Sequence, residues 1–140
     1  MDGGVSPVTS RIHDMKIHEI HPPRQFSVNN VEIRHSANIE LEPDEQITFV
    51  NPSGTEFDVA RKSWGYYATP SLNGRLIKFG LRAALVHNPT GKLFLLLIEK
   101  GKEEEFYQYV NDEHDTLICW LDNDGSIEVL VNAFKNPIPH

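Results

Sequence analysis

The residues best suited to chemistry lie in one stretch, residues 61–82, which reads RKSWGYYATPSLNGRLIKFGLR. It falls within an interval, residues 59–98, that holds six of the chain's 13 Lys and Arg and no Asp or Glu. The remaining basic residues share the rest of the chain with all 20 acidic ones. We call residues 61–82 the basic-aromatic stretch, and its candidate ligand-binding residues are Arg61, Trp64, Tyr66, Tyr67, Arg75, Lys78 and Arg82.

These residue types offer two kinds of contact to a small ligand. A guanidinium can hold a phosphate or carboxylate through two parallel hydrogen bonds. The flat face of Trp or Tyr can stack on a sugar ring or a base. A phosphorylated or nucleotide-linked sugar would use both contacts. The competing interpretation is that the basic residues face water or pair with the abundant carboxylates, while the aromatic residues fill the core.

Histidine is the second residue type that could do chemistry. The first quarter of the chain holds His13, His18, His21 and His35. No H-x-H pair occurs, and His18 and His21 would point to opposite faces of a strand. We therefore expect no metal site and no cofactor. If the protein is an enzyme, His35 and His87 are the candidate acid/base residues.

Covalent catalysis is not indicated by the remaining motifs. The single cysteine, Cys119, lies inside the apolar run LICWL, where a thiol packs as a small hydrophobic group. The chain has no G-x-S-x-G nucleophile elbow and no G-x-x-x-x-G-K phosphate loop. Enzymatic activity is therefore an alternative and not the leading expectation.

The formal net charge of the chain is −7 over 140 residues. An acidic chain of ordinary composition is typical of a globular protein, and its charge disfavours binding to nucleic acid or to an anionic membrane surface. The first residues lack a basic segment followed by an apolar one, and the longest apolar run, residues 93–98, is too short to cross a bilayer. We expect a cytoplasmic protein that binds neither membrane nor nucleic acid.

The composition does not change along the chain in a way that marks a linker. Residues 1–15 are rich in Gly, Ser, Pro and Thr, and we expect a flexible leader there. Residues 136–140 should fray in the same way. Because a domain usually takes about 100 to 200 residues, we predict a single β-rich domain over residues 16–135.

The first half of the chain predicts antiparallel strands. Apolar and polar residues alternate in residues 31–35, 39–42, 46–49 and 56–59, which is the period of strands with one face in a core. Pro22-Pro23 falls in a gap between such runs, where proline does no harm to a ladder. The rhythm of VEIRH, IELEPDEQITFV and EFDVA resembles that of the cupin-like jelly rolls. Their metal-binding histidine pair is not here, so the resemblance implies architecture alone.

The second half predicts further strands. Asn73-Gly74 is suited to a tight hairpin turn, because both central positions of that turn need positive φ. Residues 93–99 and 117–121 are apolar on both faces, which is typical of strands in the middle of a layered structure. The alternation in residues 126–132 predicts a last strand.

One helix is predicted near residues 102–111. Three glutamates lie in its first turn, where they favour the positive end of the helix dipole. Phe106, Tyr109 and Val110 make an apolar stripe. The predicted fold is therefore mainly β, with α+β at the margin: an antiparallel β-sandwich or half-open barrel closed by this helix.

The leading functional hypothesis is a small binding or accessory protein whose basic, aromatic face takes an anionic small molecule, such as a phosphorylated or nucleotide-linked sugar. One alternative is an enzyme that acts on the same ligand class, with a histidine acid/base in the mouth of the barrel. A further alternative is a protein-protein interaction module that docks an acidic partner or a second copy of itself, so a homo-oligomer stays open.

Overall fold

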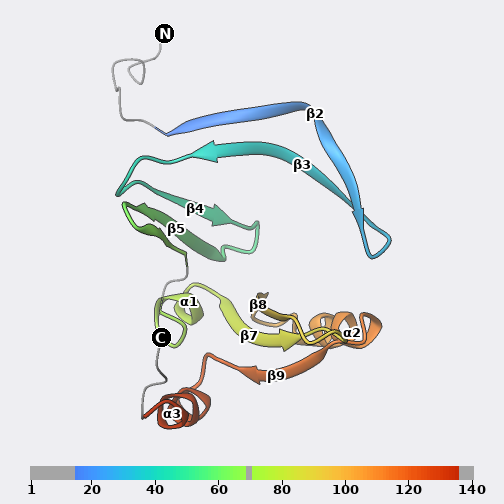
Figure 1. Cartoon of the computed structure of the whole chain (residues 1–140), viewed down its shortest axis with the longest axis vertical. Helices are drawn as coiled ribbons and strands as arrows, with labels where there is room; N and C mark the ends of the chain where they lie inside the picture. Colours follow the sequence, from blue (N-terminus) through green and yellow to red (C-terminus); the bar gives the residue numbers. More distant parts are fainter. Residues whose placement is uncertain (1–14, 69–70, 136–140) are drawn as a thin grey trace. The chain divides into compact units, whose positions relative to one another are not determined.

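The computed structural model describes residues 15–68 and 71–135 (Figure 1). The chain divides into two compact units, Met1–Ile47 with Val59–Ala68, and Thr48–Asp58 with Thr69–His140. The leader predicted over residues 1–15 lies, apart from Met15, outside the described residues. The fraying predicted over residues 136–140 lies outside them as well.

The described chain is mainly β, with three small antiparallel sheets and three helices. This confirms the predicted class. No closed barrel or sandwich is seen over residues 15–68 and 71–135, so closure of the sheets stays a prediction. None of the helices in these ranges is long and apolar enough to cross a membrane.

The first unit begins with a long hairpin made of β2 (Lys16–Val28) and β3 (Val31–Glu40). Its turn is Asn29-Asn30, and both residues have positive φ, 50° and 65°, as a two-residue hairpin turn requires. The register shifts between Glu19 and Arg24, where Figure 1 shows β2 bending. Pro22 and Pro23 lie in this irregular part of β2. The prediction that they fall in a gap between strands is therefore wrong. An irregular part of a strand tolerates proline as well as a gap does, because no ladder hydrogen bond is lost there.

The second sheet has the order β4-β5-β6. It consists of β4 (Gln46–Val50), β5 (Glu56–Lys62) and the short β6 (Gly65–Tyr67). β4 and β5 form where the sequence alternates, as predicted. The tight β5–β6 hairpin places the first half of the basic-aromatic stretch.

The third sheet belongs to the second unit and has the order β8-β7-β9. β7 (Leu81–His87) is its central strand, between β8 (Leu93–Glu99) and β9 (Thr116–Trp120). The prediction that these two apolar runs are covered on both faces, in the middle of a layered structure, is wrong, because both are edge strands with exposed apolar residues, among them Ile118 of β9. Leu93, Phe94 and Leu95 of β8 are accordingly exposed.

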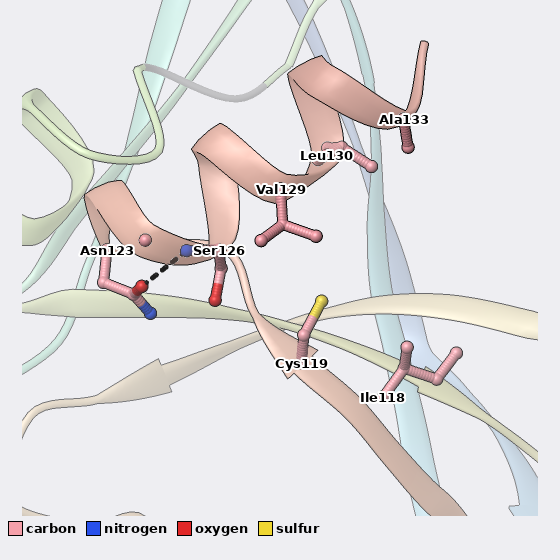
Figure 2. Close-up of a pocket in the computed structure, with 8 residues that line it drawn as sticks. Ile118, Cys119, Asn123, Ser126, Val129, Leu130 and Ala133 are labelled. Atoms are coloured by element: carbon pink, nitrogen blue, oxygen red, sulfur yellow. Dashed lines mark hydrogen bonds between the residues drawn. The ribbon is translucent and has the colours of Figure 1, made fainter.

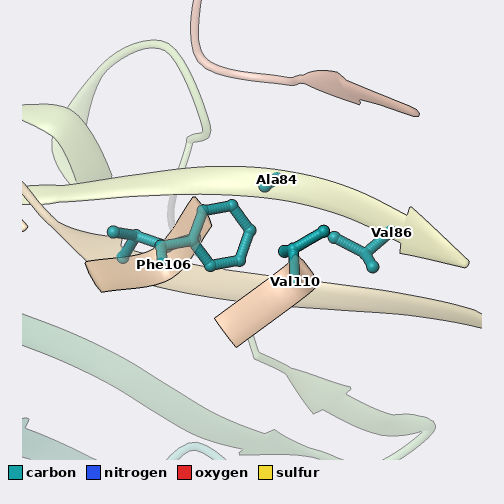
Figure 3. Packing of buried hydrophobic residues seen from close by; sticks show 5 residues of the cluster. Ala84, Val86, Phe106 and Val110 are labelled. Carbon is teal, nitrogen blue, oxygen red and sulfur yellow. The ribbon is translucent and has the colours of Figure 1, made fainter. Parts of the chain in front are cut away.

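Helix α2 (Glu103–Asp112) confirms the predicted helix. Two residues of the predicted stripe, Phe106 and Val110, pack on one face of the third sheet against Ala84, Val86 and Ile98. The third, Tyr109, is 50% exposed, so its predicted place in the stripe is wrong. Figure 3 shows Phe106 and Val110 beside β7. The opposite face of β7 contributes Leu81 and Ala83 to a second core cluster that includes the fully buried Leu76.

Two further helices replace structures that the pattern predicted to be extended. α1 (Arg75–Lys78) follows Gly74 directly, so the predicted hairpin at Asn73-Gly74 is wrong. Its first turn is held by Ser71, whose Oγ accepts a hydrogen bond from the Arg75 amide at 2.8 Å. A single turn here places Leu76 in the core, and this burial outweighs the turn preference of Asn-Gly.

α3 (Asp124–Ala133) stands where a last strand was predicted, so that prediction is wrong. The side chain of Asn123 caps the helix by accepting a hydrogen bond from the Ser126 amide at 2.8 Å. Ile127, Leu130 and Val131 are spaced for a helical stripe, while Ile127, Val129 and Val131 alternate as in a strand. The N-cap at Asn123 favours the helix over the strand. No residue of α3 is buried.

Candidate functional site

The basic-aromatic stretch is divided between the two units. Its first half, with Arg61, Trp64, Tyr66 and Tyr67, lies in the unit that contains the β2–β3 hairpin. Its second half, residues 71–82, lies in the other unit. Each half is therefore a separate group of residues.

The β5–β6 hairpin presents three exposed aromatic side chains. Trp64, in the turn, is 71% exposed, and Tyr66 and Tyr67 are 61% and 56% exposed. Arg61 pairs with Tyr66 and Ala60 pairs with Tyr67 across the two strands. Opposed residues share a face of the hairpin, so Tyr66 lies on the face of Arg61 while Tyr67 lies on the other.

Arg61 keeps most of its hydrogen-bonding capacity. Its Nη1 donates to the carbonyl oxygen of Leu41 at 2.7 Å and lies 3.8 Å from the carboxylate of Glu42. The side chain is 40% exposed. A guanidinium has five N–H donors, so several are left for a ligand. The next basic residue, Lys62, pairs with Asp44 at 2.6 Å.

A small polar cleft lies beside Arg61. It is lined by Lys16, Glu40, Leu41, Glu42 and Arg61, and its volume of about 80 Å³ is too small for a sugar. The hydrogen bond from His18, which is 2.5 Å from Glu40, lowers the pKa of that carboxyl. A sugar or a nucleotide must therefore contact Arg61 from outside the cleft.

Arg75 is held by carboxylates of its own unit. Its Nε donates to Asp58 at 2.6 Å, and its Nη2 lies 3.7 Å from Glu56. Asp58 is 12% exposed and accepts a second hydrogen bond, from Thr48 Oγ1 at 2.8 Å. The hydrogen bond from Arg75 lowers the pKa of Asp58, and Asp58 in turn raises the pKa of Arg75. The charge of Arg75 is thus compensated within the fold.

Arg82 is bound still more completely. Its Nε donates to Asp122 at 2.6 Å and its Nη1 to Glu103 at 3.2 Å, while the guanidinium lies 3.9 Å from the ring centroid of Trp120. The side chain of Asp122 is only 2% exposed. The hydrogen bond that Arg82 donates to Asp122 raises the pKa of Arg82. This cluster joins β7 to the start of α2 and the end of β9.

Lys78 differs from the two arginines near it. Its ammonium lies 5.9 Å from the ring centroid of Phe79, on which the Arg75 guanidinium also rests, at 4.3 Å. Within residues 15–68 and 71–135, Lys78 has no carboxylate partner. It is the basic residue of this half with its charge uncompensated.

The two candidate acid/base histidines lie in different units. His35 is half-buried on β3, and its Nδ1 is enclosed without a hydrogen-bond partner in the described part of the chain. His87 ends β7, with Nδ1 3.1 Å from the carbonyl oxygen of Asn88. Among the described residues, neither imidazole has a carboxylate to orient it. The same residues contain no group of three or more His, Cys, Asp or Glu that could hold a metal ion.

The structure also has a cavity that was not predicted from the sequence. It is an apolar groove of about 480 Å³ between β9 and α3 (Figure 2), lined by Ile118, Cys119, Asn123, Gly125, Ser126, Val129, Leu130 and Ala133. Cys119 is half-buried there, not enclosed on both sides as the apolar run suggested. The helical spacing of apolar residues after Asn123 was the signal that could have revealed this groove.

Comparison of the chain with protein-family models, with curated proteins and with solved structures gives no match. The candidate site is therefore interpreted from its own residues.

Proposed function

We propose that the protein is a small binding or accessory protein and that the β5–β6 hairpin holds its anionic ligand. The observation that supports this is the exposure of Trp64, Tyr66 and Tyr67 on one hairpin, with Tyr66 on the same face as Arg61. Exposed aromatic side chains in such a group are unusual outside binding surfaces, because their burial is strongly favourable. An arginine with free donors beside them adds the contact that an anion needs.

The same reasoning separates the arginines by role. Arg75 and Arg82 each already contact two carboxylates, so a ligand anion would have to displace a partner at 2.6 Å. Arg61 has only a distant carboxylate, 3.8 Å away. We therefore assign ligand binding to Arg61 and stabilisation of the fold to Arg75 and Arg82.

A nucleotide-linked sugar is the ligand class that fits this hairpin. A base or sugar ring can stack on Tyr66, and a phosphate can accept hydrogen bonds from Arg61 on the same face. Trp64, in the turn that joins the two strands, is a second exposed flat surface on this hairpin. A phosphorylated sugar would use the same two contacts with a smaller stacking area.

Tryptophan fluorescence tests this proposal, because the chain has only two tryptophans and one of them is Trp64. The full-length protein is titrated with UDP-glucose, with glucose 6-phosphate and with inorganic phosphate. We expect saturable quenching by UDP-glucose and a weaker response to the other two. The Trp64→Phe variant is the control, since it retains Trp120 as the remaining fluorophore.

In the Trp64→Phe protein the quenching should disappear. Quenching that persists in this variant would place the ligand near Trp120 instead and contradict the proposal. Emission that is unchanged up to millimolar concentrations of all three probes would contradict it equally.

An acidic protein surface is the second candidate ligand, and one observation favours it. Lys62 and Tyr67 lie on the hairpin face opposite Arg61 and Tyr66, so both faces carry one basic and one aromatic residue. A small molecule uses one face, whereas a protein groove can enclose both. If the ligand contacts both faces, Tyr67→Ala and Tyr66→Ala should each abolish ligand binding. That result would indicate an acidic protein surface as the ligand.

A further inference from the structure

The β2–β3 hairpin has one apolar face that is exposed to solvent. Its register pairs residues that lie on the same face of an antiparallel ribbon. Three such pairs are apolar on both strands, and their six members are between 36% and 58% exposed: Ile17 with Ile39, Phe26 with Ile33, and Val28 with Val31. The opposite face is polar and internally paired, with His18 on Glu40 and Ser27 on Glu32.

A two-stranded hairpin with such a face is not stable by itself in water. Six apolar side chains at roughly half exposure leave about 450 Å² of apolar surface, which is within the range that marks an interaction site. Two copies of this face would bury about 900 Å² before any polar rim is counted, close to the roughly 1,000 Å² of a specific interface. The face is therefore large enough to support a dimer.

We propose that this face is the interface of a homodimer in which two β2–β3 hairpins pack face to face around a two-fold axis. The charges on the face select the arrangement. Glu19 lies opposite Ala37 across the two strands, and the next pair on this face is Arg24 opposite His35. A two-fold axis that runs across the strands, midway between these two pairs, places Arg24 of one copy over the partner's Glu19. This contact occurs twice in each dimer.

The same axis matches the other side chains by size and polarity. It places Ile17 over the partner's Phe26, and Ile39 over the partner's Ile33. It also sets His35 against the partner's Ala37, so a large residue meets a small one. The main competing arrangement, centred on His35, would stack Arg24 on the partner's Arg24, and like charges in direct opposition are destabilising.

Arg24 is available for this role. Its guanidinium rests 4.8 Å from the ring centroid of Phe26 at the edge of the apolar face. Among the described residues, it has no carboxylate within ion-pair distance. Glu19 lies 3.4 Å from His21, on the same exposed bend of β2. None of these residues belongs to the β5–β6 hairpin, so the dimer does not depend on the proposed function.

Sedimentation velocity of the full chain tests the dimer, with Arg24→Glu, with Glu19→Arg and with the double exchange. Over about 1 to 200 µM, we expect the unmodified protein to approach twice the mass of one chain. Each single reversal should raise the dissociation constant at least about tenfold, because it creates two like-charge contacts. The double exchange should restore dimerisation. Arg34→Glu, on the polar face, is the matched control and should leave the dimer intact.

Circular dichroism of each variant confirms that it is folded. Ile33→Ser, which removes the apolar contact with the partner's Ile39 without changing charge, should also weaken the dimer. A monomer over the whole concentration range overturns the proposal, including a monomer whose hairpin amides are protected because its own chain covers the face. A dimer that tolerates both single reversals, that is not restored by the double exchange, or that Arg34→Glu disrupts equally, overturns it as well.

Discussion

At the scale of single residues, the carboxylate partners of the basic residues decide which of them can bind a ligand. Asp58 and Asp122 are nearly enclosed and accept short hydrogen bonds from Arg75 and Arg82. Removing either partner would leave a charge in a poorly hydrated place, which costs more than the pair contributes. These arginines therefore serve the fold first.

The lowered pKa of Asp58 makes the contribution of the Arg75–Asp58 pair to stability depend on pH. The hydrogen bond from Arg75 holds that pKa below its ordinary value. As the pH falls, the unfolded chain takes up the proton first, near the ordinary Asp pKa of about 3.9. The stabilisation is therefore complete above this pH and is lost as the pH falls through the lower pKa of the folded protein.

We expect the free energy of unfolding of Asp58→Asn to lie below that of the unmodified protein at pH 6, and the difference to shrink as the pH falls toward 3. Urea unfolding followed by circular dichroism at several pH values measures it. Glu104→Gln, which removes one negative charge from an exposed position of α2, is the control. A difference for Asp58→Asn that stays constant from pH 6 to pH 3 would refute the role of its ionisation.

The sequence indicates the residue types of the site but not their partners. The absence of acidic residues from residues 59–98 suggested free positive charge, and the competing interpretation was that the basic residues face water or pair with carboxylates elsewhere in the chain. Arg82 reaches Asp122, 40 residues further along the chain. Alternation and composition describe neighbours in the sequence, and such distant ion pairs depend on how strands and helices come together. Trp64, Tyr66 and Tyr67 were predicted as ligand residues, and their high exposure is compatible with that role.

At the scale of elements, the secondary-structure prediction was correct where the sequence shows only one hydrophobic period, either that of a helix or that of a strand. α2 has a helical stripe and no competing alternation, and its glutamates favour its first turn. Residues 126–132 carry both periods, so the strand prediction failed when Asn123 capped a helix. β8 and β9 were predicted to be covered on both faces because they are apolar, but what covers a strand depends on contacts far apart in sequence, and both lie at sheet edges with exposed apolar residues.

The connection from α1 to β7 depends on a glycine. Gly80 has φ +92°, and a Cβ added there would lie 3.0 Å from Cγ2 of Thr55. Gly101, with φ +94°, has nothing within 4 Å of such an atom. A side chain at either position would therefore meet the same backbone strain, and the two positions differ only in the room available for a Cβ atom.

We expect Gly101→Ala to lower the free energy of unfolding by about 1 kcal/mol, the cost of a side chain in the left-handed region. Gly80→Ala should cost about 1 kcal/mol more than Gly101→Ala, because Thr55 must also move. Urea unfolding of the two variants in parallel measures the difference. Equal losses would mean that the contact with Thr55 does not limit this connection.

At the scale of the whole molecule, the net charge is −7, and the two units use their surface residues differently. In the second unit the acidic residues neutralise Arg75 and Arg82 and thereby link strands to helices. In the first unit, exposed aromatic and apolar residues are concentrated on two hairpins, β2–β3 and β5–β6. The sandwich or half-barrel that the alternation of the first half suggested stays a prediction.

The division of roles between Arg61 and Arg82 is the central claim, and one paired measurement tests it. Calorimetric titration with UDP-glucose and urea unfolding are carried out on Arg61→Gln and Arg82→Gln. We expect Arg61→Gln to weaken binding about tenfold, or about 1.4 kcal/mol, and to lower the free energy of unfolding by less than about 1 kcal/mol. Arg82→Gln should lower that free energy by about 2 kcal/mol, because Asp122 loses its charged partner, and should leave the affinity unchanged. Weaker binding in Arg82→Gln together with unchanged binding in Arg61→Gln would contradict the claim.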